Sequence, residues 1–234
     1  MSQLSAAPPA KPRGTRKRRR TGRSTEDVLA VIRERIASHE LLPGSRVQEA
    51  ELAKEFGVSR TIVREVLTAL EYRGLIKRIP NRGAVVTHLE LSEVYEIFEI
   101  REVLEGLCVR LATLKAPKGA WRKHIDRLGP SMQAMIEGGD VGDYIRALDD
   151  LRDDMVHYAG NSHAAQFLDQ VLEKARVIKG RVTVLPGRAE TGRRMHLEML
   201  KLMDAGDANA AELKKQEIIR SAREWLDRYR NYIL

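Results

Sequence analysis

The sequence predicts a mainly α-helical protein with two folded parts, a small N-terminal domain that ends in a β-hairpin and a larger C-terminal domain of helices alone. With 234 residues, the chain is long enough to bury two hydrophobic cores. Leu, Ala, Glu and Arg are frequent and aromatic residues make up only 5%, which favours an aliphatic helical interior. Apolar residues recur at helical spacing, whereas short strand-like runs occur near residues 75–88.

Residues 1–23 are predicted to form a disordered basic tail. They contain eight of the 41 Lys and Arg side chains and none of the 33 acidic ones, so the rest of the chain carries 33 of each sign. Neighbouring like charges repel one another, and the segment offers no apolar run to bury. The tail is interpreted as a phosphate-binding arm without sequence preference; the alternative is a solvated extension with no role. The balanced remainder excludes a uniformly basic nucleic-acid coat.

Residues 24–90 are predicted to form the first domain, with helices over residues 24–38, 49–56 and 60–73. Ser24 and Ser59 are the residue type preferred at helix N-caps. A turn at Leu42-Pro43-Gly44-Ser45 separates the first two helices. The runs 75–79 and 84–88 around Pro80-Asn81-Arg82-Gly83 predict a β-hairpin.

The second and third of these helices have the pattern of a helix-turn-helix. Ala53 supplies the small residue needed where the helices cross, and Gly57 suits the positive φ of the tight turn. One face of the third helix is apolar, and the opposite face begins with Arg60 and Arg64, one turn apart. Guanidinium groups at the N-terminal end of such a helix suit guanine and phosphate in the DNA major groove.

The predicted DNA-contacting residues lie on this face and on the hairpin: Ser59, Arg60, Thr61, Arg64, Thr68, Asn81, Arg82 and Gly83. The alternative is an ordinary solvated helix face. That alternative does not predict the small residue, the glycine and the caps in this order, followed by a basic hairpin.

These motifs closely resemble the winged helix-turn-helix of GntR-type bacterial transcription regulators. The resemblance rests on the Leu42 turn, on Gly57-Val58-Ser59-Arg60-Thr61, on Gly74-Leu75-Ile76 and on Asn81-Arg82-Gly83. It implies that Arg60 and Arg64 contact operator DNA and that the wing around Gly83 enters the minor groove. Ala50 and Ile62 depart from the common family residues, Arg and Pro, and leave the operator sequence open.

Residues 91–234 are predicted to form an all-α six-helix bundle for effector binding and dimerisation. The expected helices span residues 92–115, 118–137, 141–160, 163–184, 188–205 and 207–231, and Gly129-Pro130 should kink or split the second. The segment resembles the FCD (FadR C-terminal domain) group of the same family in its VanR-like form. The residues that match are Arg101 with Leu104-Glu105, Ala159-Gly160-Asn161, and His196 followed by Gly206-Asp207.

Three polar residues, Arg101, Arg152 and His196, fall on otherwise apolar helix faces. A buried guanidinium needs an anionic partner, either an internal carboxylate (Glu105, Asp149 or Asp150) or an acidic effector. Each arginine alone leaves both alternatives open, and the two together favour an effector. His196 alone fits a satisfied core histidine, and in the effector hypothesis it assists the arginines. Cys108 fits plain packing.

A metal site is not predicted. Many members of the FCD group bind a metal through an Asp and three His, and the resemblance places Leu148, Arg152, His196 and Ile218 at those positions. One ligand of the four is retained. Asp153 and His157 have suitable spacing but lie on the opposite, solvated side of their helix. We therefore expect no metal and no cofactor.

The sequence as a whole favours a homodimeric transcription regulator, expected to be a repressor, whose affinity for operator DNA is controlled by a small carboxylate-bearing effector. The alternatives are a metal-dependent FCD regulator and a non-specific architectural DNA-binding protein. An enzyme is not predicted, because no nucleophile–base pair, phosphate loop or complete metal site is recognised. A single cysteine and the lack of a membrane-length apolar run favour the cytoplasm, at the nucleoid when DNA-bound.

Overall fold

The computed structural model describes residues 23–38, 40–80, 82–88 and 90–233. The predicted tail therefore lies outside the described residues apart from Arg23, and so does Asn81 of the hairpin. The elements of the N-terminal domain are α1 (Thr25–Ala37), β1 (Arg46–Val47), α2 (Glu49–Phe56), α3 (Arg60–Tyr72), β2 (Ile76–Ile79) and β3 (Gly83–Val86). Those that follow are α4 (Leu91–Lys115), α5 (Arg122–Arg127), α6 (Pro130–Glu137), α7 (Gly142–Ala159), α8 (Ser162–Thr183), α9 (Arg188–Ala205) and α10 (Ala208–Ile233).

The mainly α fold with a winged helix-turn-helix is confirmed. Helix α1 begins with the predicted cap, because the Ser24 hydroxyl accepts a hydrogen bond from the Asp27 N–H while the Asp27 carboxylate accepts one from the Ser24 N–H. Gly57 ends α2 in the left-handed conformation, with φ of 64°, which glycine adopts without steric cost. The chain can then turn sharply into α3 at Ser59.

A three-stranded antiparallel sheet closes this domain, in the order β1-β3-β2. The hairpin β2–β3 was predicted, with Ile76 paired to Val86 and Ile79 to Gly83. Strand β1 was not predicted, because a strand of two residues is too short to show an alternation of polar and apolar side chains. Its pairing partner is β3, where Arg46 lies opposite Val85. The core of the domain comes from one face of each helix and from the sheet: Val28, Ile32, Ile36, Val47, Leu52, Phe56, Val63, Val66, Leu67, Leu70, Leu75, Ile76, Ala84 and Val86.

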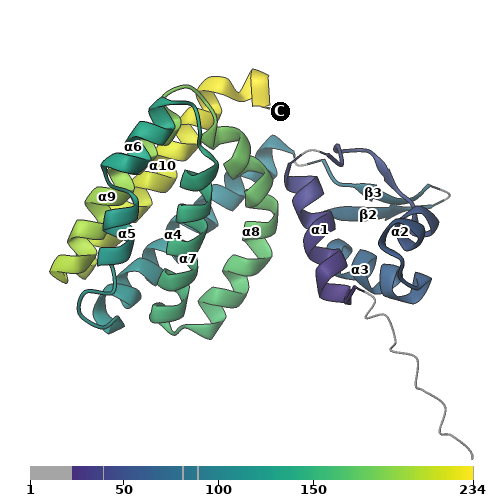
Figure 1. Ribbon diagram of the computed structural model, residues 1–234, viewed down its shortest axis with the longest axis horizontal. Helices are drawn as coiled ribbons and strands as arrows, with labels where there is room; N and C mark the ends of the chain where they lie inside the picture. Colours follow the sequence, from purple (N-terminus) through teal and green to yellow (C-terminus); the bar gives the residue numbers. More distant parts are fainter. Residues whose placement is uncertain (1–22, 39, 81, 89, 234) are drawn as a thin grey trace, which may run out of the picture.

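Helices α4 to α10 surround a second hydrophobic core, in which the long helices α4 and α10 lie side by side (Figure 1). The second predicted helix is split into α5 and α6, with Pro130 at the start of α6. Helix α5 begins at Arg122, four residues later than predicted, because residues 117–121 turn: the Ala120 N–H donates to the Pro117 carbonyl. The other five predicted helices agree with the structure to within two residues at each end.

The two domains contact each other through α1 and α8, which lie next to each other in Figure 1. Lys174 on α8 forms an ion pair with Glu93 on α4, and its side chain lies against Gly74 just after α3. The N-terminal domain and the helical domain are therefore joined by side chains as well as by the segment between β3 and α4.

Candidate functional site

The outward face of α3 presents the residues that the sequence predicted for DNA contact. Arg60, Thr61, Arg64 and Thr68 are exposed, while Val63 on the opposite face is fully buried. The Ser59 hydroxyl accepts a hydrogen bond of 3.3 Å from the Ile62 N–H and so acts as the N-cap. Ser59 thus caps the N-terminal end of α3, where the positive end of the helix dipole lies, and the exposed residues of this face begin at that end.

Two charged neighbours hold side chains of this face. Arg64 Nε lies 2.9 Å from Glu49 Oε2 on α2. Arg78 on β2 donates from Nη2 to the Thr68 hydroxyl at 3.1 Å and pairs through Nε with Glu71. Ion pairs between exposed side chains are weak, so both guanidinium groups can exchange these partners for phosphate. Arg78 was not predicted from the sequence, although its strand belongs to the same basic stretch.

The wing brings two further residues of the prediction to the surface. Arg82 and Gly83 are both exposed at the start of β3. Arg46 of the unpredicted strand β1 lies close to Gly83. Arg46 and Arg78 also line a groove between the start of α2 and the hairpin. Arg78 contacts Thr68 of α3 and shares the groove with Arg46, so positive charge extends from α3 onto the sheet.

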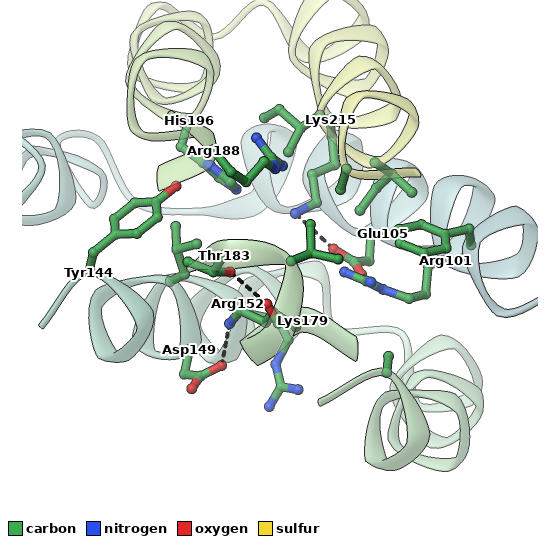
Figure 2. Close-up of a pocket in the computed structure, with 17 residues that line it drawn as sticks. Arg101, Glu105, Tyr144, Asp149, Arg152, Lys179, Thr183, Arg188, His196 and Lys215 are labelled. Carbon is green, nitrogen blue, oxygen red and sulfur yellow. Dashed lines mark hydrogen bonds and ion pairs between the residues drawn. The ribbon is translucent and has the colours of Figure 1, made fainter. Parts of the chain in front are cut away.

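A cavity of about 80 Å³ lies within the helical domain. All three predicted effector residues, Arg101 on α4, Arg152 on α7 and His196 on α9, line it (Figure 2). Further polar side chains come from α7, α8, α9 and α10: Tyr144, Asp149, Lys179, Thr183, Arg188 and Lys215. Phe98, Leu148, Val182 and Ile218 are among the apolar part of the wall. The cavity thus combines an apolar lining with an excess of cations.

One wall of the cavity is a buried ion triad. Glu105 Oε1 lies 2.7 Å from Arg101 Nε, and Glu105 Oε2 lies 2.7 Å from Lys215 Nζ. The Glu105 side chain is only 4% exposed. Burial disfavours its ionisation, but Arg101 and Lys215 outweigh that effect and hold the pKa of Glu105 well below its usual range. Arg101 thus forms one of the internal pairs that the sequence left open.

Arg152 has a different partner from those predicted. It donates from Nε and Nη2 to Asp153 Oδ1, at 3.2 and 2.6 Å. Asp149 pairs instead with Lys179, 2.7 Å away, and Asp150 pairs with Arg127. The Asp153 carboxylate is 67% exposed, so it holds the Arg152 guanidinium toward the outer side of α7.

His196 is buried and neutral. Its Nδ1 lies 2.7 Å from the Gly192 carbonyl oxygen, and because a carbonyl only accepts, Nδ1 carries the proton. Burial, with Lys215 and other cations nearby, lowers the pKa of His196 well below 6.5. The remaining ring nitrogen, Nε2, is therefore a hydrogen-bond acceptor at neutral pH.

Comparison with known proteins identifies both domains. Residues 24–86 match the family "Bacterial regulatory proteins, gntR family", and residues 96–221 match the FCD domain. The chain belongs to the GntR family, FCD group. It is a DNA-binding transcription regulator and not an enzyme.

Two curated relatives and one solved structure resemble this GntR regulator along most of their length. It is 30% identical over 170 residues to the HTH-type transcriptional regulator YdhC of Bacillus subtilis, covering 73% of this chain and 76% of that one. It is 28% identical over 181 residues to a probable D-xylose utilization operon transcriptional repressor of Paenarthrobacter nicotinovorans, covering 76% and 77%. The solved structure of McbR/YncC from Escherichia coli shares the fold, with a TM-score of 0.72, 21% identity and coverage of 88% and 98%.

The cavity of this GntR regulator does not fit the metal that many FCD proteins hold. The four aligned positions, Leu148, Arg152, His196 and Ile218, do line one cavity, but only His196 is a metal-ligand type. Among the described residues, no three His, Cys, Asp or Glu side chains are grouped so that they could hold a metal ion. Asp153 and His157 are both exposed, on the solvated side where they were predicted.

Four polar residues of the cavity wall were not predicted from the sequence of the regulator: Tyr144, Lys179, Arg188 and Lys215. Lys215 lies three residues before Ile218, so helical spacing alone could have placed it on the inward stripe. Arg188 follows Pro186-Gly187 at the start of α9, where a charged residue usually faces solvent, and no pattern signalled its burial.

Within the part of the chain that the structure describes, no helix has the length and apolar character needed to cross a membrane.

Proposed function

We propose that this GntR regulator is a homodimeric repressor whose affinity for operator DNA is lowered by a small carboxylate bound in the cavity of the helical domain. The observation that carries the proposal is the cavity itself. Arg101, Arg152 and His196 line it from three helices, and the wall contains five Lys and Arg side chains against two acidic ones. Such a cavity favours an anionic ligand. A repressor role is supported by the relative from Paenarthrobacter nicotinovorans.

In this proposal α3 reads the major groove. Arg60, Thr61, Arg64 and Thr68 face the base edges and phosphates, Ser59 lies at the end nearest the backbone, and the wing residues Asn81, Arg82 and Gly83 enter the minor groove. Arginine suits both duties because its planar fork pairs with guanine or phosphate in two places. The basic tail, residues 1–23, adds affinity for phosphate without sequence preference.

A second copy of the chain is proposed to cover an exposed apolar surface on α4 and α8. Ile100, Val103 and Leu114 of α4 and Phe167 of α8 are between 46% and 65% exposed, and Ile100, Val103 and Phe167 line a shared depression. An exposed apolar patch of this kind indicates a protein contact. A two-fold dimer also supplies the two recognition helices that a palindromic operator requires.

Ligand binding can reach the DNA-binding domain through the Lys179–Asp149 pair. Both residues line the cavity, and both also line a groove whose other wall includes Glu34 and Ala37 of α1. An anion that draws Lys179 away from Asp149 changes the surface on which α1 rests. Operator affinity then falls if the liganded arrangement spaces the two recognition helices wrongly.

The regulator proposal is tested by gel-shift titration against operator DNA selected from a random pool. Arg60→Ala and Arg64→Ala should each weaken specific binding by about 1–3 kcal/mol, while Arg194→Ala, an exposed arginine on α9, should not. A protein that selects no preferred sequence would be an architectural DNA-binding protein. Unchanged operator affinity in both α3 variants would remove the recognition-helix assignment.

A further inference from the structure

Arg188 is the cation of the cavity for which the structure provides no acid. It is 7% exposed, and its Nη1 is buried without a hydrogen-bond partner. It forms no ion pair with any residue whose side chain the structure describes. The other cations of the wall are paired: Arg101 and Lys215 share Glu105, Lys179 pairs with Asp149 and Arg152 with Asp153. The excess positive charge of the cavity therefore lies on Arg188 and on the triad in which Arg101 and Lys215 share the single carboxylate of Glu105.

An unpaired buried guanidinium is costly, because burial removes its hydration and no carboxylate replaces it. Burial lowers the pKa of Arg188, with Tyr144 acting in the opposite direction and Arg101 lowering it further. A neutral apolar side chain at this position would avoid the cost. An anion from outside the chain would satisfy the group.

The absence of a side chain at Gly192 leaves room for the Arg188 guanidinium inside the domain. Gly192 follows Arg188 by one turn on the same face of α9. A Cβ atom at Gly192 would lie 2.5 Å from Tyr144 Oη and 3.1 Å from Arg188 Nη1. The guanidinium and the phenol therefore both rest against bare backbone, in a space that any side chain at position 192 would occupy. Tyr144 is itself 1% exposed, so its hydroxyl adds a second fixed polar group beside Arg188.

His196 lies one further turn along this face of α9. It offers a hydrogen-bond acceptor, whereas Arg188 offers only donors. Its Nδ1–H is used by the Gly192 carbonyl, which leaves Nε2 to accept. In Figure 2, Arg188, His196 and Tyr144 lie together at one end of the cavity. A ligand that satisfies this end carries an anionic group for Arg188 and a hydrogen-bond donor for His196.

We propose that Arg188 binds the carboxylate of the effector and that His196 Nε2 accepts a hydrogen bond from a hydroxyl group of the same molecule. The ligand class is a small aliphatic hydroxycarboxylate, whose short apolar part fits the lining of Val182, Ile218 and Ile219 in a cavity of about 80 Å³. Its regulatory meaning rests on the proposed function, but binding itself does not require DNA.

The test measures the melting temperature of the full chain at constant ionic strength with three matched probes: 2-hydroxybutyrate, butyrate and 2-hydroxybutanamide. A bound ligand raises the melting temperature by mass action. We expect the largest rise with 2-hydroxybutyrate, a smaller one with butyrate and none with the uncharged amide. Arg188→Met should raise the dissociation constant for 2-hydroxybutyrate about 10- to 100-fold, whereas Arg194→Met on the outer face of α9 should leave it unchanged.

Without ligand, Arg188→Met should melt at the same temperature as the parent protein or higher, since an unpaired buried charge is removed. A lower melting temperature would show that Arg188 supports the fold, and would overturn the assignment. If 2-hydroxybutyrate stabilised the parent protein and Arg188→Met equally, Arg188 would not be the residue that binds the carboxylate. The ligand would then bind elsewhere in the cavity. Equal rises with 2-hydroxybutyrate and butyrate would overturn the His196 contact. No rise with either acid would overturn the ligand class, whereas operator binding would stand.

Discussion

Glu105→Gln is expected to lower the free energy of unfolding of the helical domain by about 3–5 kcal/mol, the usual loss when one partner of a buried ion pair is removed. The change keeps the size of the side chain but removes the negative charge that Arg101 and Lys215 share. Their side chains are 11% and 6% exposed. Both cations would then remain buried beside a neutral amide.

The magnitude follows from two opposing contributions. At an effective dielectric constant of about 20, unit charges about 4 Å apart attract by roughly 4 kcal/mol, so the two ion pairs of Glu105 give a gross attraction of roughly 8 kcal/mol. The mutual repulsion of Arg101 and Lys215 and the desolvation of three ions offset much of it. The net loss therefore falls well below the gross attraction but well above that of a surface pair, about 0–1 kcal/mol.

Denaturant unfolding followed by circular dichroism measures this loss. For a domain of this size, it corresponds to a fall in melting temperature of roughly 6–20 °C. The matched control is Glu102→Gln, one turn away on α4. The Glu102 carboxylate is partly exposed and pairs with Arg220 at 3.7 Å, so its removal should cost under about 1 kcal/mol. A loss below 1 kcal/mol for Glu105→Gln would refute the assignment of the triad as a stabilising unit.

The pH dependence of stability gives an independent check on Glu105. Its pKa is lowered in the folded state by Arg101 and Lys215, so its stabilising contribution is present above the pKa of the unfolded carboxyl, about 4.3. The contribution is lost as pH falls below that value toward the folded-state pKa. The stability difference between the parent and Glu105→Gln should be constant from pH 7 to 5.5 and shrink below pH 4.5. A difference that does not change in acid would contradict the ionised state of Glu105.

Three further predictions concern DNA binding and its control. Deleting residues 1–23 should weaken binding to all DNA and lower the slope of log affinity against log salt by about 0.9 for each phosphate that the tail neutralises; an unchanged slope would exclude the arm. Glu49→Gln should free Arg64 and strengthen operator binding about 1.5- to 5-fold at low salt, in a gel-shift titration where unchanged affinity would show that the pair does not compete with DNA. Asp149→Asn leaves Lys179 without its carboxylate, so 2-hydroxybutyrate should bind at least as tightly, but its effect on operator affinity should fall; an undiminished effect would remove the Lys179–Asp149 pair from the coupling.

Much of the fold could be predicted from the sequence because the deciding interactions are local. Helix α2 spans Glu49–Phe56 and helix α9 spans Arg188–Ala205, as predicted. Caps, turns and helical stripes act over a few residues, so Ser24, Gly57 and Ser59 mark their elements without knowledge of the remainder of the chain. The outward position of Arg60 and Arg64 follows from the same spacing, since Val63 and Val66 had to face the core.

The partners of the buried charges were decided only by the tertiary structure. Spacing placed Arg101, Arg152 and His196 toward one cavity, but it could not show that Glu105 would be shared with Lys215, 110 residues away, or that Arg152 would turn to Asp153. Arg188 carried no inward signal because its burial depends on the bare backbone of Gly192 and on Tyr144 from another helix. Strand β1 likewise exists only because β3 offers it hydrogen bonds. The ends of a helix are determined by residues that are close in sequence. The balance of charge in a cavity depends instead on which helices pack together, and these helices carry residues that are far apart in the chain.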